Sequence, residues 1–234
     1  MCGIVGLFLK DKSLELRLGE MLTDMLVTMS DRGPDSAGIA IYKSSNSSYK
    51  KITLQSSNPT KDFKNLKTSL EKLIHQGLEI SIVDTHAIIN FETKYLEKVK
   101  ALLSDSFSCL KIMSIGDSIE IYKEVGSPET VANRFHLSKM IGSHGIGHTR
   151  MATESAVTTM GAHPFSTGND QCLVHNGSLS NHNSLRRKLI RNGIKFETDN
   201  DTEVAAAYLT FKMNEGYNLG DALEVGLDEL DGFY

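Results

Sequence analysis

The feature that most constrains the fold is the apolar run Ile4-Val5-Gly6-Leu7-Phe8, which begins almost at the amino terminus. Its β-branched and aromatic residues predict a buried strand that ends at the polar Lys10-Asp11-Lys12. Cys2 stands just before this strand. If Met1 is removed, Cys2 carries a thiol and a free α-amine on one residue, at the head of a buried strand.

Length, composition and charge limit the class of protein to which the chain can belong. The chain has 234 residues, 40% of them hydrophobic, and a formal net charge of -4. We expect one large domain, or a domain with an inserted subdomain. The lack of a Lys/Arg-dense block argues against nucleic acid as a partner. No apolar run approaches the roughly 18 residues that span a bilayer, and no secretory signal is present, so no membrane partner is expected.

The cysteines indicate the compartment. Cys2, Cys109 and Cys172 are an odd number and widely spaced, which is not the pattern of a disulfide framework. We therefore expect a cytoplasmic protein in which Cys2 is a free thiol.

The first part of the chain reads as alternating strands and helices. Apolar residues every three or four positions predict an amphipathic helix over 14–29, and residues 37–42 predict a second strand. Polar residues 43–61 predict a loop or a strand-and-loop excursion.

Residues from about 43 to about 140 have a different character, and we expect them to form a small inserted α+β subdomain with a role in partner contact or regulation. Its expected elements are a helix over about 61–76, a strand over 79–92, a helix over 93–105, a hairpin over 107–125 and a short helix that begins at Ser127-Pro128, with Ser127 as N-cap.

The last part of the chain carries two further helices. One begins near residue 198, with Asp199 or Asp201 as the capping candidate, and the other covers 218–230. The final residues, Asp-Gly-Phe-Tyr, predict the start of a strand.

An amino-terminal cysteine is a self-contained catalytic unit. Its α-amine has an unperturbed pKa of about 7.7–8 and can take the thiol proton without a separate histidine. The alternative is a structural role, because thiols also behave as small apolar residues. Position 2 by itself favours that structural role.

Other residues supply what a thiolate that attacks an amide needs. In His175-Asn176-Gly177-Ser178, the Asn176 amide and the Gly177 backbone N–H could donate to an oxyanion, although Asn-Gly is also a common turn. Arg150 offers a fork for a carboxylate. Asp201 offers a counter-charge for an ammonium, or is only a helix cap.

Six motifs together carry a family resemblance. They are Met-Cys-Gly-Ile-Val-Gly at the start, Asp-Arg-Gly-Pro-Asp-Ser-Ala-Gly at 31–38, Gly-His-Thr-Arg-Met-Ala-Thr at 147–153, His-Pro-Phe at 163–165, His-Asn-Gly at 175–177 and Asp-Thr-Glu at 201–203. In this set and order the chain resembles the class II, N-terminal-nucleophile glutamine amidotransferases. It looks most like the stand-alone amidotransferase subunit of glutamate-synthase-type complexes, including the N-methylglutamate synthase type.

The resemblance assigns roles to the matching residues. It implies Cys2 as nucleophile, Asn176 and Gly177 as the oxyanion hole, Arg150 as the partner of the glutamine α-carboxylate and Asp201 as the partner of its α-ammonium. Further residues are implied around these: Thr153 in the loop that closes over glutamine, His163 in the pocket, and Arg32 as an organiser of the nucleophile's surroundings.

The implied reaction is hydrolysis of L-glutamine through a Cys2 γ-glutamyl thioester, with the ammonia passed to a partner synthase subunit. No cofactor is expected in this chain; a flavin or iron–sulfur cluster would belong to partner subunits. The implied fold is α+β, a four-layer αββα sandwich. Residues 1–234 would form one amidotransferase domain, interrupted by the insertion at about 43–140 and incomplete at its C-terminus. Met151 departs from the Trp or Tyr of many relatives.

Three other hypotheses stay open beside this one. A metal site could use His144 and His148 with later histidines, but the interleaved glycines and the missing Cys or Glu partners argue against it, so we expect no metal. A different N-terminal-nucleophile amidase would keep Cys2 without the other motifs. A non-catalytic interaction or regulatory subunit would have no turnover at all.

Overall fold

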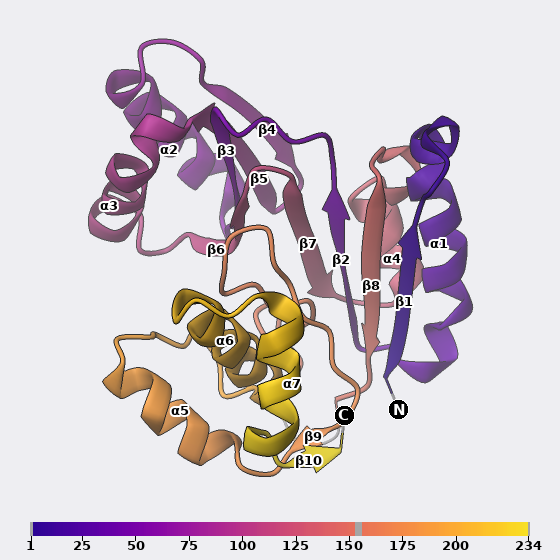
Figure 1. Cartoon of the computed structure of the whole chain (residues 1–234). Helices are drawn as coiled ribbons and strands as arrows, with labels where there is room; N and C mark the ends of the chain where they lie inside the picture. The colour runs from indigo at the N-terminus through magenta and orange to yellow at the C-terminus, as the bar shows by residue number, and fades with distance from the viewer. Residues whose placement is uncertain (1, 153–155, 234) are drawn as a thin grey trace.

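The computed structural model describes residues 2–152 and 156–233, and its first sheet has four antiparallel strands in the order β1-β8-β2-β7 (Figure 1). The strands are β1 (Gly3–Phe8), β2 (Ser36–Tyr42), β7 (Ile119–Val125) and β8 (His144–Arg150). The strands expected at 4–8 and 37–42 are confirmed. The sheet therefore begins with the first described residues of the chain.

Helices α1 (Leu18–Thr28) and α4 (Pro128–Arg134) pack against this sheet. Leu18, Leu22 and Leu26 are fully buried, and their spacing of four residues places them on one face of α1, against strand residues such as Ile39. The helix begins later than predicted, because residues Lys12–Arg17 form the 3₁₀ helix η1. The Ser127 cap of α4 is confirmed: its Oγ accepts a hydrogen bond from the Thr130 N–H at 3.2 Å.

A second antiparallel sheet has its own hydrophobic core. Its strands, in the order β4-β5-β3-β6, are β3 (Tyr49–Gln55), β4 (Glu79–Val83), β5 (His86–Glu92) and β6 (Lys111–Gly116). Helices α2 (Pro59–Leu73) and α3 (Leu96–Ser106) pack with it, and Phe63, Leu66 and Leu70 of α2 are buried among its strand residues.

Two expectations for this region were wrong. Residues 79–92 are not one strand, because the chain turns at Asp84-Thr85, where Asp84 takes a left-handed φ of 53°. Nor do residues 107–125 form a hairpin: β6 belongs to the second sheet and β7 to the first. The connection between them is fixed from elsewhere in the chain, since the Asp170 carboxylate accepts hydrogen bonds from the backbone N–H groups of residues 117, 118 and 119.

Within residues 156–233, the chain forms three helices and a two-stranded sheet (Figure 1). These elements are β9 (Ser178–Leu179), α5 (His182–Arg191), α6 (Asp201–Asn214), α7 (Leu219–Glu229) and β10 (Gly232–Phe233). The helix expected over 218–230 and the final strand are confirmed. The capping prediction for α6 was wrong: Asn200 is the N-cap, and its Oδ1 accepts from the Thr202 N–H at 2.8 Å.

Short 3₁₀ helices complete the described chain: η2 (Ser30–Arg32), η3 (Thr93–Tyr95) and η4 (Leu137–Lys139). Two antiparallel sheets with packed helices confirm the α+β sandwich class expected from the sequence. Among residues 2–152 and 156–233, no helix has the length and apolar character that crossing a membrane requires.

Candidate active site

The pairing of β1 with β8 brings Cys2 beside Arg150. Gly3 lies opposite Thr149 in the register, so the residues just before and just after them are neighbours. The Gly3 N–H donates to Thr149 Oγ1 at 3.1 Å, and Thr149 Oγ1 donates to the Met29 carbonyl at 3.2 Å. A Cβ at Gly3 would lie 2.8 Å from Thr149 Oγ1, so only glycine allows the strand this close approach.

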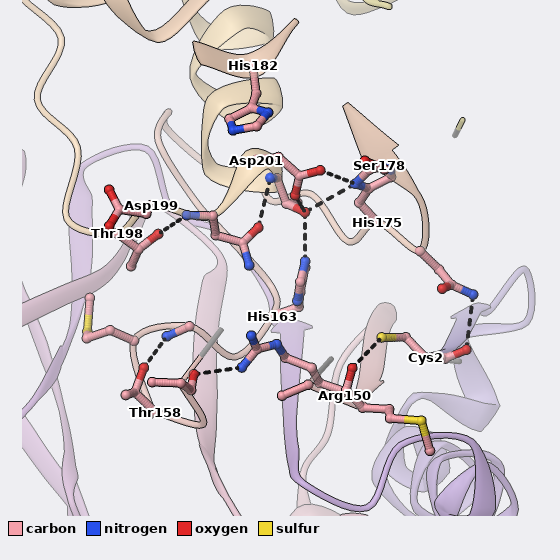
Figure 2. A pocket seen from close by; sticks show the side chains of 18 of the residues that line it. Cys2, Arg150, Thr158, His163, His175, Ser178, His182, Thr198, Asp199 and Asp201 are labelled. Carbon is pink, nitrogen blue, oxygen red and sulfur yellow. Dashed lines mark hydrogen bonds and ion pairs between the residues drawn. The ribbon is translucent and has the colours of Figure 1, made fainter. Parts of the chain in front are cut away.

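The backbone of Cys2 is held by two side chains. Asn176 Nδ2 donates to the Cys2 carbonyl oxygen at 3.0 Å, and Arg32 Nε donates to the same oxygen at 3.3 Å. The Cys2 sulfur is partly buried and lies 3.9 Å from the Met151 carbonyl oxygen (Figure 2). Asn176 and Gly177 come just before β9.

A cavity of about 710 Å³ opens beside Cys2. Its walls come from the head of β1, the end of β8, the segment after β8, the approach to β9 and the start of α6 (Figure 2). The lining residues that the sequence singled out are Cys2, Arg150, Met151, His163, Asn176, Gly177 and Asp201.

Arg150 is the last residue of β8 and only 6% exposed. Its Nη1 donates to the Ala156 carbonyl at 3.3 Å. Asp35, in the motif at 31–38, holds the chain on both sides of Met151. Its N–H donates to the Arg150 carbonyl at 3.1 Å, and its Oδ2 accepts from the Ala152 N–H at 2.7 Å. This motif therefore fixes where the strand ends and where the cavity wall begins.

Asp201, the first residue of α6, lies on the opposite wall of the cavity (Figure 2). Its Oδ2 accepts from the Leu179 N–H at 2.9 Å and lies 4.0 Å from His175 Nδ1. The neighbouring Thr202 hydroxyl is 2.8 Å from His163 Nε2 and 3.3 Å from His175 Nδ1. One threonine thus connects two histidines at the start of the helix that carries Asp201.

His163 stacks on His148, with ring centroids 4.1 Å apart. Burial lowers the pKa of His163 well below its usual value, and burial also lowers the pKa of His148 to about 4. Both rings are therefore neutral near pH 7, so the stack carries no charge repulsion. His148 Nε2 lies 3.1 Å from the His175 carbonyl oxygen, which fixes the backbone next to Asn176.

The structure brings most of the predicted site residues together. Cys2, Arg150, His163, Asn176, Gly177 and Asp201 line one cavity, and Arg32 contacts the Cys2 carbonyl from outside that lining. Thr153 lies outside the described residues.

Sequence reasoning missed Asp35, His175 and Thr202 as parts of the site. Each stood inside a motif that had been recognised, in Asp-Arg-Gly-Pro-Asp, His-Asn-Gly and Asp-Thr-Glu respectively. Only their contacts across the fold reveal what they do.

The described residues contain no group of three or more His, Cys, Asp or Glu side chains arranged to hold a metal ion. His144 and His148 share one face of β8, but His144 stacks on Tyr42 with centroids 4.1 Å apart, whereas His148 stacks on His163.

Comparison with known proteins gives matches at three levels. Residues 135–218 match the family model described as "Glutamine amidotransferase domain". Over 234 residues the chain is 60% identical to "Glutamine amidotransferase-like protein GlxB" of Rhizobium meliloti (strain 1021), covering 100% of this chain and 77% of that protein. It is also 35% identical over 140 residues to a glutamine–fructose-6-phosphate aminotransferase (isomerizing) of Fusobacterium nucleatum, covering 59% of this chain and 22% of that protein.

A solved structure shares the fold: glutamine phosphoribosylpyrophosphate amidotransferase from B. subtilis, with a TM-score of 0.52 and 18% identity. The match covers 99% of this chain and 33% of that chain, so this chain spans about a third of that protein. The 60% identity to a relative that this chain covers over more than two thirds of its length shows the family. The chain belongs to the glutamine amidotransferase family.

Proposed function

We propose that this chain is the glutaminase part of an amidotransferase, which hydrolyses L-glutamine to glutamate and ammonia through a γ-glutamyl thioester on Cys2. The observation that carries the proposal is one cavity lined by a thiol, an amide, a guanidinium and a carboxylate, from Cys2, Asn176, Arg150 and Asp201. Glutamine needs a nucleophile and an oxyanion donor at its amide, and partners for both of its charges.

The nucleophile in this proposal is the Cys2 thiolate. Once Met1 is removed, the α-amine of Cys2 accepts the thiol proton, since its unperturbed pKa is about 7.7–8. The sulfur bonds to the carbon of the side-chain amide, the C–N bond breaks, and the α-amine returns the proton to the departing ammonia. Water then attacks the thioester, which releases glutamate and restores the thiol.

Asn176 is proposed to stabilise the oxyanion. A primary amide has two N–H donors. One N–H of Asn176 Nδ2 donates to the Cys2 carbonyl oxygen at 3.0 Å. The other N–H can donate to the oxyanion, together with the Gly177 N–H. This arrangement supports Asn176 as the oxyanion donor, because the same side chain is hydrogen-bonded to the backbone of the nucleophile. A single preorganised donor of this kind contributes about 3–4 kcal/mol to a transition state.

Arg150 and Asp201 are proposed to bind the two charges of the glutamine backbone. The guanidinium can form a bidentate pair with the α-carboxylate, and the carboxylate of Asp201 can accept from the α-ammonium. His163 completes the pocket wall, Arg32 organises the Cys2 backbone, and Thr153 belongs to the loop proposed to close over the substrate.

The ammonia is proposed to pass to a synthase subunit of glutamate-synthase type in the cytoplasm. Ammonia released into water is mostly protonated near pH 7, and ammonium is not a nucleophile, which supports direct transfer. Any flavin or iron–sulfur cluster would belong to that partner.

The test is glutamate release from L-glutamine by protein whose N-terminal mass shows Cys2 as the first residue. We expect turnover by the wild type and none by Cys2→Ala, with Cys2→Ser and Cys109→Ala as companions. Cys109 is exposed and outside the cavity lining, so its variant should keep wild-type turnover. Equal glutamate release by Cys2→Ala and the wild type would exclude the proposed nucleophile.

A further inference from the structure

Lys123 of β7 is a buried lysine whose ammonium contacts a single backbone segment. The residue is 3% exposed, and its Nζ donates to the carbonyl oxygens of Ala162 at 2.8 Å and of Met160 and Pro164 at 3.2 Å each. An ammonium has three N–H donors. The three carbonyls therefore use its full hydrogen-bonding capacity.

An aromatic ring also lies close to this ammonium. No ion pair of Lys123 occurs among residues 2–152 and 156–233. Its Nζ lies 4.4 Å from the centre of the Phe165 ring, and burial lowers its pKa to about 7, with Glu203 acting in the opposite direction. Burying a charged group costs free energy unless hydrogen bonds compensate. An apolar side chain would fill the same space without that cost, so the contacts to the carbonyls are what the lysine contributes.

The segment that Lys123 holds is a wall of the cavity beside Cys2. Its carbonyls at 160, 162 and 164 bind the lysine, whereas Met160, Gly161 and His163 line the cavity. His163 in turn contacts Thr202, next to Asp201, with 2.8 Å between Nε2 and Oγ1. The position of this segment therefore sets both the wall and the support of α6.

Glu124, the next residue of β7, anchors the same wall at a second point. Its carboxylate accepts a hydrogen bond from the Thr159 hydroxyl and another, at 3.2 Å, from the Thr85 hydroxyl. Thr85 lies in the turn between β4 and β5 of the second sheet. Glu124 thus connects the second sheet to the cavity wall, next to the residue that holds the carbonyls of that wall.

We infer that Lys123 is a positioning residue for glutamine binding. Its ammonium holds residues 160–164 in place, so that the pocket wall and Asp201 are positioned to contact the substrate. The inference rests on the proposed function, since it needs glutamine as the ligand of this cavity. Lys123 does not line the cavity and acts only through the segment it binds.

The test is calorimetric binding of L-glutamine in a Cys2→Ala background, where no turnover consumes the ligand. Lys123→Met keeps the apolar stem and removes all three donors. We expect a Kd at least about tenfold higher, because a misplacement of about 1 Å in a substrate-positioning group can cost about 100-fold. The matched control is Lys50→Met: Lys50 is also buried on a strand, but it pairs with Asp117, outside the cavity lining, so its variant should bind as the Cys2→Ala parent does.

A second variant covers the case in which Lys123→Met fails to fold. Thr159→Val removes the hydroxyl that Glu124 holds and leaves the buried amine intact, so it should also weaken glutamine binding, by a smaller factor. In the Cys2-containing protein, Lys123→Met should raise KM for glutamine while iodoacetamide alkylates Cys2 at the wild-type rate. The rate of alkylation reports the reactivity of the Cys2 thiol and does not depend on glutamine binding. A general loss of structure would change this rate as well as KM.

The outcomes separate the two proposals. If the Cys2→Ala parent binds no glutamine, the proposed function itself fails. If the parent binds glutamine and Lys123→Met and Thr159→Val bind it equally well, glutamine is the ligand and Lys123 is not a positioning residue.

Discussion

Asn176 donates its side-chain amide to the carbonyl oxygen of Cys2 at 3.0 Å, across 174 positions of sequence. Arg32 donates to the same oxygen at 3.3 Å. The residue proposed to stabilise the oxyanion is thus also one of two side chains that place the nucleophile. Any movement of the segment before β9 displaces donor and nucleophile together.

Replacement of Asn176 by Ala should lower kcat for glutamine hydrolysis by about 10²- to 10³-fold, as expected for loss of one oxyanion donor. KM should change little, because Asn176 is proposed to act in the transition state. Asn192→Ala is the control, since Asn192 is exposed at the end of α5 and its side-chain amide donates to the Lys188 carbonyl. Unchanged kcat in Asn176→Ala would contradict the assignment.

Replacement of Asp35 by Ala should raise KM for glutamine by about tenfold, because the chain after Arg150 loses the carboxylate that accepts from the Ala152 N–H at 2.7 Å and positioning groups are sensitive to small shifts. Steady-state kinetics with varied glutamine measures the effect. Asp31→Ala, at an exposed aspartate of the neighbouring helix η2, should leave KM unchanged. Equal KM values in the two variants would show that Asp35 does not place the cavity wall.

Replacement of Asp170 by Ala should lower the free energy of unfolding by about 3 kcal/mol, because backbone groups that bond to a charged carboxylate lose their partner. Asp170 accepts from the backbone N–H groups of Asp117, Ser118 and Ile119 at 2.7, 2.9 and 3.0 Å. Urea unfolding measures the change, with the exposed Asp228→Ala as control. A loss no greater than that of the control would mean that the connection between β6 and β7 holds without this carboxylate.

Acidification should destabilise the fold through His148. Burial lowers the pKa of His148 to about 4 in the folded protein, against about 6.5 in the unfolded chain. Above pH 6.5 the ring is neutral in both states and contributes no pH dependence. Between pH 6.5 and 4 only the unfolded chain takes up the proton, so stability falls with decreasing pH, by about 3 kcal/mol in all.

The measurement is urea unfolding of the wild type and of His148→Gln at several pH values in this window. The variant should show a shallower loss of stability on acidification, since one titrating group is gone. Parallel curves for the two proteins would contradict the depressed pKa.

The structural elements that are determined by neighbouring residues were predicted well. The first strand follows from Ile4–Phe8, α1 from its buried leucines every four positions, and the start of α4 from Ser127 before Pro128. In each case the residues that determine the element lie within a few positions of one another, so sequence periodicity and capping rules apply.

What was missed depends on contacts between distant segments. The turn at Asp84-Thr85 has no glycine or proline to mark it, and the split between β6 and β7 depends on Asp170, about fifty positions further along the chain. The motifs identified Cys2, Arg150 and Asn176, but no local pattern indicates that Lys123 binds three carbonyls of the cavity wall. Such residues are recognised only by what the fold places beside them.

The most direct test of Cys2 as the nucleophile for glutamine is labelling by a glutamine analogue that carries a diazoketone in place of the side-chain amide. Peptide mass spectrometry then locates the label among Cys2, Cys109 and Cys172. We expect one label per chain, on the sulfur of an N-terminal Cys2, and protection by excess L-glutamine. Label on the exposed Cys109, or label on Cys2 that glutamine does not prevent, would contradict it.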